Sequence, residues 1–254
     1  MNKWISAMIV VLLTGLASLA HPGLAHAGQL AYLSIINQNT NERLNIWRHE
    51  GRHYVAGNPG DRYAIEVTNR TGGRLLSVVS VDGVNVINGA TASPAQSGYV
   101  LDAGQPLQIR GWRKNMDEVA AFYFTRLPDS YAARTDRADN AGVIGIALFH
   151  EYVEPVVMQE QSVGSLAAAP APMASARAKR AESADADSKL GTGHGERLVS
   201  GSRMTEFRRA SSAPSEIISI HYDTYARLVA RGIIPRSRNT APVPFPGSFV
   251  PDPS

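Results

Sequence analysis

Residues 77–87 read SVVSVDGVNVI, two apolar runs separated by Asp82-Gly83. Asp-Gly readily takes the positive φ angles of a type I′ turn, the two-residue turn that best joins antiparallel strands. With that loop Val81 lies opposite Val84 and Val79 lies opposite Val86, all four on one face, while Ser80 and Asn85 pair on the other. Loop chemistry and side-chain alternation therefore agree on one register, and the stretch predicts a β-hairpin.

The same alternation of short apolar runs and turn residues extends through residues 30–157, and no stretch before residue 160 has a helical period. Further strands are predicted at residues 30–37, 62–69, 98–101, 107–112, 119–126 and 142–153. The predicted fold class is all-β, a β-sandwich or open barrel of about eight to ten short strands, because such strands with frequent turns are typical of both.

A change of composition divides the rest of the chain. The β-rich domain is predicted to span residues 28–160, followed by an Ala/Ser/Pro-rich linker at 161–189, a small strand-helix segment at 190–238 and a proline-rich tail at 239–254. The linker has almost no large apolar side chains, so it cannot bury enough surface to offset its ordering entropy and is expected to be disordered.

The segment at 190–238 contains one strand and one helix by pattern. Residues 216–222, EIISIHY, alternate as a strand, and Asp223 is expected to cap a helix over residues 224–231 that Gly232 ends. Because one strand and one helix cannot form a core, the segment is expected to dock on the β-rich domain.

Residues 1–27 have the layout of a cleavable secretory signal peptide. Lys3 gives the positive start, residues 4–20 the apolar run, and Ala25-His26-Ala27 the small-x-small site, so the cut is predicted after Ala27. The apolar run is shorter than the roughly 20 residues that span a bilayer, and none follows it. The mature protein is therefore expected in the periplasm or outside the cell, without a transmembrane segment.

The chain has no cysteine, which excludes disulfides, lipid attachment at a lipobox and thiolate metal sites. Residues 28–160 carry 12 Lys and Arg against 14 Asp and Glu, whereas residues 161–254 carry 12 against 8. The basic excess of the second part is scattered and forms no stripe interleaved with aromatic residues. Nucleic-acid binding is therefore not expected.

His49-Glu50-Gly51-Arg52-His53 matches the H-E-x-x-H motif of zinc proteases. That motif works on a helix, where both imidazoles share a face and the glutamate activates the zinc-bound water. The central glycine costs about 1 kcal/mol relative to alanine in a helix. A hairpin with Glu50-Gly51 as its loop instead pairs Trp47 with Tyr54 and puts the two histidines on opposite faces. A three-residue loop would place them opposite one another, which leaves metal binding open.

Other chemical motifs are weaker. Residues 150–154, HEYVE, repeat the spacing but continue the preceding strand and are expected to form its polar end, with a third zinc ligand as the alternative. Residues 190–197, LGTGHGER, do not match the phosphate-binding glycine pattern and are expected to form a flexible turn. His194 beside Glu196 is the catalytic alternative there. No G-x-S-x-G elbow or other nucleophile set is present.

The polar loop at residues 128–141, PDSYAARTDRADNA, lies between two strongly apolar strands. Loops on a rigid β scaffold often carry recognition, and Tyr and Arg are enriched at binding hot spots. Tyr131, Arg134, Asp136 and Arg137 are therefore the predicted binding residues. The alternative is a loop whose charges pair with one another in solvent.

Several strings resemble a family of uncharacterised proteobacterial exported proteins. They include SVDGVNVINGATAS, GYVLDAGQPLQIRGWR, VAAFYFTRLPDSYAARTDR and GVIGIALF, together with LGTGHGER and YDTYARLVARGIIP. The resemblance covers about two thirds of the predicted mature chain and implies a bacterial source and a two-part arrangement around a variable linker. It implies no activity and no site.

The predicted function is non-enzymatic: binding of an envelope protein or surface ligand, or a structural role in the envelope, with no cofactor. An assembly factor that offers a sheet edge to a client strand is a variant of this prediction. The alternative is an exported zinc hydrolase with His49 and His53 as ligands and Glu50 as general base.

Overall fold

The computed structural model describes residues 28–154 and 189–236. Within the first range the strands are β1 (Ala31–Asn37), β2 (Glu42–Arg43), β3 (Ile46–His49), β4 (Arg52–Ala56), β5 (Arg62–Asn69), β6 (Leu75–Val81), β7 (Val84–Asn85), β8 (Tyr99–Leu101), β9 (Pro106–Ile109), β10 (Gly111–Arg113), β11 (Glu118–Arg126) and β12 (Val143–His150). Between β11 and β12 lie the short helices η1 (Leu127–Asp129), α1 (Tyr131–Arg134) and η2 (Ala138–Asn140). The second range holds β13 (Leu190–Val199), β14 (Glu216–Asp223) and α2 (Tyr225–Ala230).

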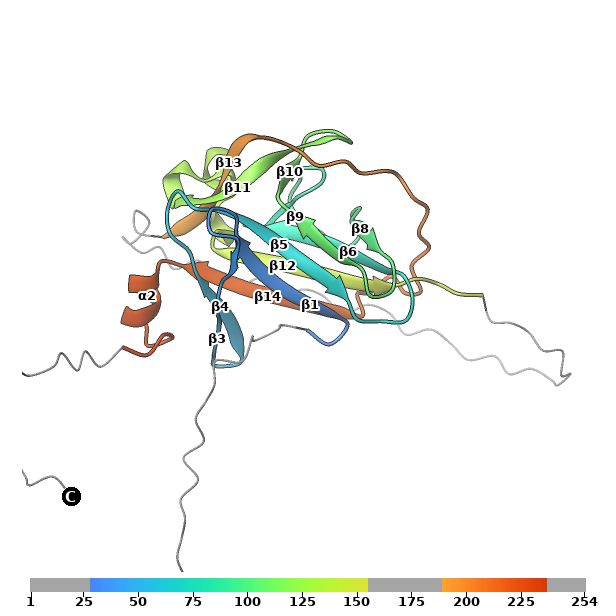
Figure 1. Cartoon of the computed structure of the whole chain (residues 1–254), viewed down its shortest axis with the longest axis horizontal. Coiled ribbons are helices and arrows are strands. Elements are labelled where there is room, and N and C mark those ends of the chain that lie inside the picture. The colour runs from blue at the N-terminus through green and yellow to red at the C-terminus, as the bar shows by residue number, and fades with distance from the viewer. Residues whose placement is uncertain (1–27, 155–188, 237–254) are drawn as a thin grey trace, which may run out of the picture.

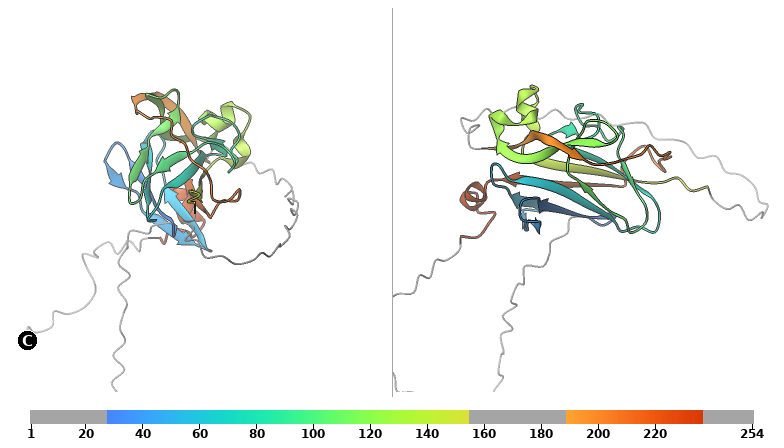
Figure 2. Two further views of the ribbon diagram at one scale, coloured as in Figure 1. Left: turned by 90° about the vertical axis from the view of Figure 1, so that its right-hand side faces the viewer. Right: turned by 45° about the horizontal axis from the view of Figure 1, so that its top comes forward.

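These strands form two sheets that face one another as the layers of a β-sandwich (Figures 1 and 2). Sheet A has the order β10-β11-β5-β1-β2, with β13 also paired to β11 and β9 to β5. Sheet B has the order β3-β4-β14-β12-β6-β7, with β8 also paired to β6. The all-β sandwich expected from the strand pattern is confirmed.

One apolar core fills the space between the sheets. Sheet A contributes residues such as Phe122 and Ile65, and sheet B contributes Ile144 and Ile220, all at most 1 % exposed. Burying such side chains contributes about 1.5–3 kcal/mol each. The alternating apolar residues of the strands form this core, and the core stabilises the fold of a chain that has no disulfides.

The hairpin at residues 77–87 is confirmed. Ser80 pairs with Asn85 and Val81 with Val84 in the β6–β7 register, and the loop residues Asp82 and Gly83 have φ angles of 51° and 73°. These positive values are those of the predicted turn.

Residues 190–197 do not form the expected turn. They belong to β13, which pairs with β11 over most of its length, so that this part of the prediction is wrong. Neighbouring groups occupy the space that a side chain at these positions would need, which explains the glycines. A Cβ on Gly191 would lie 2.5 Å from the Cβ of Ser130, and one on Gly193 would lie 2.1 Å from the ring of Tyr123.

The C-terminal described segment is part of both sheets. β13 belongs to sheet A, and β14 lies inside sheet B between β12 and β4, where its pairing with β4 is parallel. Sheet B would lack a central strand without it, so this segment does more than dock on a finished domain. Smaller differences are that the strand expected at 107–112 is divided into β9 and β10, and that the loop at 128–141 contains the single turn α1.

The helix after β14 begins one residue later than predicted. Thr224, not Asp223, is the N-cap, and its hydroxyl accepts a hydrogen bond from the Arg227 amide at 3.3 Å. Asp223 still lies inside the end of β14, and its carboxylate accepts from the Thr224 amide at 2.8 Å. Gly232, with φ 71°, follows the helix as expected.

Thr224→Ala is expected to lower the free energy of unfolding by about 1 kcal/mol, because the substitution removes the N-cap acceptor. Thr224→Ser keeps the hydroxyl and serves as the control, with a change close to zero. Urea denaturation followed by far-ultraviolet circular dichroism measures both, and equal losses in the two variants would contradict the capping role.

Three predicted segments fall largely outside the described residues: the signal peptide at 1–27, the linker at 161–189 except Lys189, and the tail at 239–254. Among the described residues, no helix has both the length and the apolar character that crossing a membrane requires.

Candidate functional site

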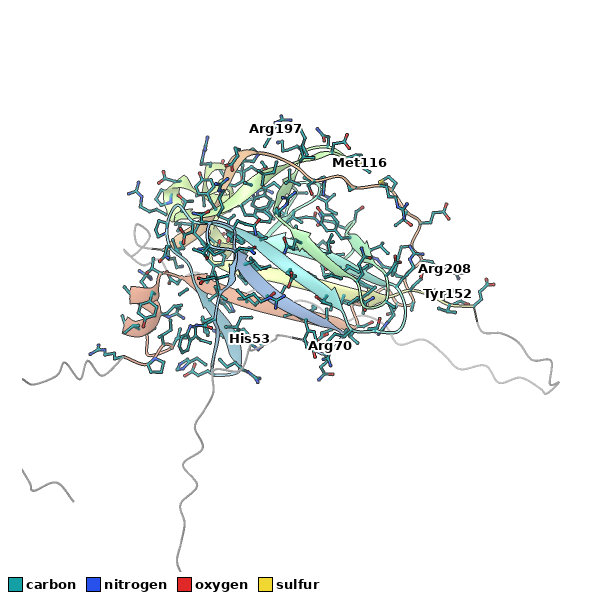
Figure 3. All side chains as sticks on the ribbon, in the orientation of Figure 1. His53, Arg70, Met116, Tyr152, Arg197 and Arg208 are labelled. Atoms are coloured by element: carbon teal, nitrogen blue, oxygen red, sulfur yellow. The ribbon has the colours of Figure 1, made fainter. Side chains whose placement is uncertain are left out.

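The H-E-x-x-H residues lie on the β3–β4 hairpin. Arg48 pairs with His53 and His49 with Arg52, and the loop residues Glu50 and Gly51 both have positive φ. Because side chains alternate along a strand, His49 and His53 lie on opposite faces of sheet B. Figure 3 labels His53 on this hairpin.

The surroundings of the two histidines differ. His49 Nε2 lies 3.8 Å from the exposed carboxylate of Glu50. Burial and the neighbouring charge of Arg48 lower the pKa of His53. A hydrogen bond with the backbone of Ser219 raises this pKa by less, so the net shift is downward. Across residues 28–154 and 189–236, no three His, Asp or Glu side chains gather closely enough to hold a metal ion.

The predicted binding loop divides into structural and exposed residues. Tyr131 is half-buried, with ring centroids 4.9 Å from Trp112 and 5.8 Å from His194. The Arg137 guanidinium donates to the Gly89 carbonyl at 2.8 Å and so ties the loop to the β7–β8 connection. Arg134 and Asp136 are exposed, and Asp136 has a positive φ of 57°. The Arg137 guanidinium also lies over the Tyr131 ring, 5.8 Å from its centroid. The structure therefore brings Tyr131 and Arg137 together and leaves Arg134 and Asp136 exposed beside them.

A pocket of about 310 Å³ lies at one end of the sandwich, beside α2. We call it the basic pocket, because its charged lining is mostly cationic. The cationic lining residues are Arg52, Lys189, Arg227 and Arg231, and the other polar or aromatic ones are Tyr54, His221, Tyr222 and Asp223. The end of the 128–141 loop, Ala141, and the next residue, Gly142, complete its wall together with Leu190.

Strand register explains how the pocket is assembled. His221 on β14 pairs with Tyr54 on β4, so that these two side chains lie on one face of sheet B, with ring centroids 5.4 Å apart. Arg52 and Asp223 lie two residues from this pair on the same face, since side chains alternate. α2 covers that face, because Tyr54 packs with Leu228 in a small second core.

One carboxylate partly neutralises the pocket. Asp223 is only 6 % exposed; its carboxylate accepts a hydrogen bond from Arg227 Nε at 3.0 Å and lies 3.9 Å from Arg231. Within the described residues, no carboxylate pairs with Arg52 or Lys189 at salt-bridge distance. Counted over the described residues that line the pocket, four cationic side chains and one carboxylate give a formal charge of three positive.

His221 contributes a neutral imidazole at neutral pH. Burial lowers its pKa, and the cationic charges of Arg52 and Arg231 lower it further. An anion bound in the pocket would oppose the second effect, because it compensates the two arginines.

Directly behind the pocket lies a buried hydrogen-bond network that joins the two sheets. Asp82 accepts from the Tyr222 hydroxyl at 2.5 Å, from the Gly142 amide at 2.9 Å and from the Thr192 amide at 2.7 Å. The Thr192 hydroxyl lies 2.7 Å from the hydroxyls of both Tyr222 and Tyr63. Because Tyr222 and Gly142 also line the pocket, the network fixes the pocket's inner wall.

Burial dominates the acid–base properties of this network. It raises the pKa of Asp82 to about 6, although three donors and the backbone near Val143 act in the opposite direction. The pKa values of Tyr222 and Tyr63 are raised well above their ordinary range by burial and by the charge of Asp82. All three hydroxyls and the carboxylate are buried and have partners inside the protein, so this network links the two sheets.

The sequence alone did not indicate the basic pocket. One signal was present: Asp223, Arg227 and Arg231 follow one another at intervals of four, the spacing of ion pairs on one helix face. Lys189 stands at the end of the predicted linker, and Arg52 lies inside the H-E-x-x-H motif, so neither position suggests a shared pocket. Their convergence depends on the parallel pairing of β4 with β14, which no local pattern displays.

Comparison with protein-family models, with curated proteins and with solved structures finds no match for this chain. The resemblance to exported proteobacterial proteins therefore stays a prediction.

Proposed function

We propose that this chain is an exported protein of the periplasm or cell exterior that binds a small anionic ligand and does not transform it chemically. The observation that carries the proposal is the basic pocket, where four cationic side chains from β4, from the residue before β13 and from α2 with its C-cap line one cavity together with a single carboxylate. Concave sites with a few convergent polar groups are where small ligands bind in most proteins. The export part is supported by the signal-like layout of residues 1–27.

The zinc hydrolase alternative has less support. It requires the imidazoles of His49 and His53 to converge on one ion, and the β3–β4 register directs them to opposite faces. The exposed side chains Arg134 and Asp136 are the part of the 128–141 loop that an envelope partner would contact.

Titration calorimetry on residues 28–254 with a set of small phosphates, sulfates and carboxylates tests the proposed function. At least one anion is expected to bind, and Arg52→Gln is expected to weaken its binding about tenfold, the effect of losing one charge-assisted hydrogen bond. Arg126→Gln is the matched control, because Arg126 is also exposed but pairs with Asp129 outside the pocket. If no anion binds, or if both variants weaken binding equally, the proposed function is wrong.

A further inference from the structure

The cations of the basic pocket come from three directions. Arg52 begins β4, Lys189 immediately precedes β13, and Arg227 and Arg231 come from α2 and its C-cap. A carboxylate is planar and offers its lone pairs within one plane, so donors from three sides cannot all reach it well. A tetrahedral oxyanion presents three terminal oxygens in three directions, which suits donors arranged in this way.

The charge of the pocket favours a dianion. The described lining residues, Asp223 included, carry a formal charge of three positive, and the neutral His221 adds one more hydrogen-bond donor or acceptor. A phosphate monoester carries about −1.5 to −2 at neutral pH, because its second pKa is near 6. A sulfate monoester or a monocarboxylate brings only one charge.

Asp223 also prepares the site for binding. It holds the Arg227 guanidinium at 3.0 Å and lies 3.9 Å from Arg231 before any ligand arrives. Side chains that are already ordered lose less conformational entropy when they bind, so this buried carboxylate acts as an orienting group rather than as a competitor for the cations.

The size and lining of the pocket restrict the rest of the ligand. A volume of about 310 Å³ is at the small end of the range for ligand pockets. Apart from Ala141 and Leu190, the lining consists of polar, charged or aromatic side chains and the backbone of Gly142. A compact polar group such as one sugar ring fits both observations better than a lipid chain does.

We propose that the basic pocket binds a small phosphate monoester with a polar, sugar-like body, its phosphoryl group held by Arg52, Lys189, His221 and Arg231. This inference rests on the proposed function and specifies its ligand class. The phosphoryl oxygens accept hydrogen bonds from the two guanidiniums, the ammonium and the imidazole. No covalent step is involved.

Three probes with the same hexose body test the inference: glucose 6-phosphate, glucose 6-sulfate and glucuronate. Calorimetry on residues 28–254 at low salt and neutral pH is expected to show that the phosphate binds at least about tenfold more tightly than the other two, since it brings a second charge. Arg231→Gln and Lys189→Gln are each expected to weaken phosphate binding about tenfold, whereas Arg126→Gln leaves it unchanged.

The outcomes separate the two proposals. Equal or tighter binding of glucuronate or the sulfate overturns the phosphate inference while the anion-binding function stands. Binding of none of these anions, nor of inorganic phosphate, overturns both. Lys189 and Arg231 are exposed, so their variants are expected to fold, and circular dichroism verifies this before titration.

Discussion

Replacing Asp82 with alanine is expected to lower the free energy of unfolding by about 3–5 kcal/mol at mildly acidic pH, since several buried donors lose their acceptor together. The Gly142 and Thr192 amides and the Tyr222 hydroxyl all donate to this carboxyl group. Alanine is also strained at the Asp82 φ of 51°, a region that aspartate and asparagine tolerate better. Guanidinium denaturation of residues 28–254, followed by tryptophan fluorescence, measures the loss.

The same residue makes stability depend on pH. The pKa of Asp82 is about 6 in the folded protein and 3.8 in the unfolded chain, so the folded state keeps a proton that the unfolded state releases. The stability that this proton contributes is fully present below about pH 3.8 and is lost as the pH rises through about 6. The free energy of unfolding changes by roughly 3 kcal/mol across this range. The network has room for the proton, because the Tyr222 and Thr192 hydroxyls can each donate in either direction.

Asp82→Asn isolates this effect, since asparagine keeps the shape and the turn conformation but does not titrate. Glu66 and Glu118 have pKa values lowered by hydrogen bonds with arginines and neighbouring amides and change stability in the opposite sense. The informative quantity is therefore the stability of the original protein minus that of the variant at each pH. We expect this difference to fall between about pH 4 and pH 7. A difference that stays constant across that range would show that Asp82 is ionised throughout.

Features that short segments encode were predicted well. Asp82-Gly83 and Glu50-Gly51 each sit between alternating residues, so loop and strands specify one register without help from the rest of the chain, and both registers are confirmed. The helix position was missed by one residue, because Asp223 and Thr224 are both good N-cap residues and only the end of β14 decides between them.

Features that depend on distant partners were not predicted. The role of Asp82 beyond its turn requires Tyr222, which lies 140 positions away. β13 has no alternation to recognise, since three of its first six residues are glycines, and its identity as a strand comes from its pairing with β11. A glycine in a strand often marks a close approach by another group, and this was the signal available at residues 190–197.

When each of three glycines is replaced by alanine, the change in the free energy of unfolding is expected to depend on the space around that glycine. A Cβ on Gly191 would lie 2.5 Å from the Cβ of the buried Ser130, one on Gly195 would lie 3.0 Å from the Ala121 carbonyl oxygen, and one on Gly201 would meet nothing within 4 Å. We expect losses of about 2–3 kcal/mol for Gly191→Ala and about 1 kcal/mol for Gly195→Ala, which are overpacking costs. Gly201→Ala is expected to be neutral or to stabilise by about 0.5 kcal/mol, because it only restricts the unfolded chain.

A second substitution identifies the clash as the cause. Ser130→Gly removes the Cβ that Gly191→Ala would strike and costs only a few tenths of a kcal/mol at an N-cap position. The double variant should therefore be more stable than the sum of the two single losses predicts, by more than about 0.5 kcal/mol. If the glycines instead cradled a ligand, Gly191→Ala would weaken binding and leave stability unchanged. Strict additivity together with unchanged stability would thus favour a binding role for residues 190–197, whereas non-additivity assigns these glycines to the contact between β13 and the loop before β12.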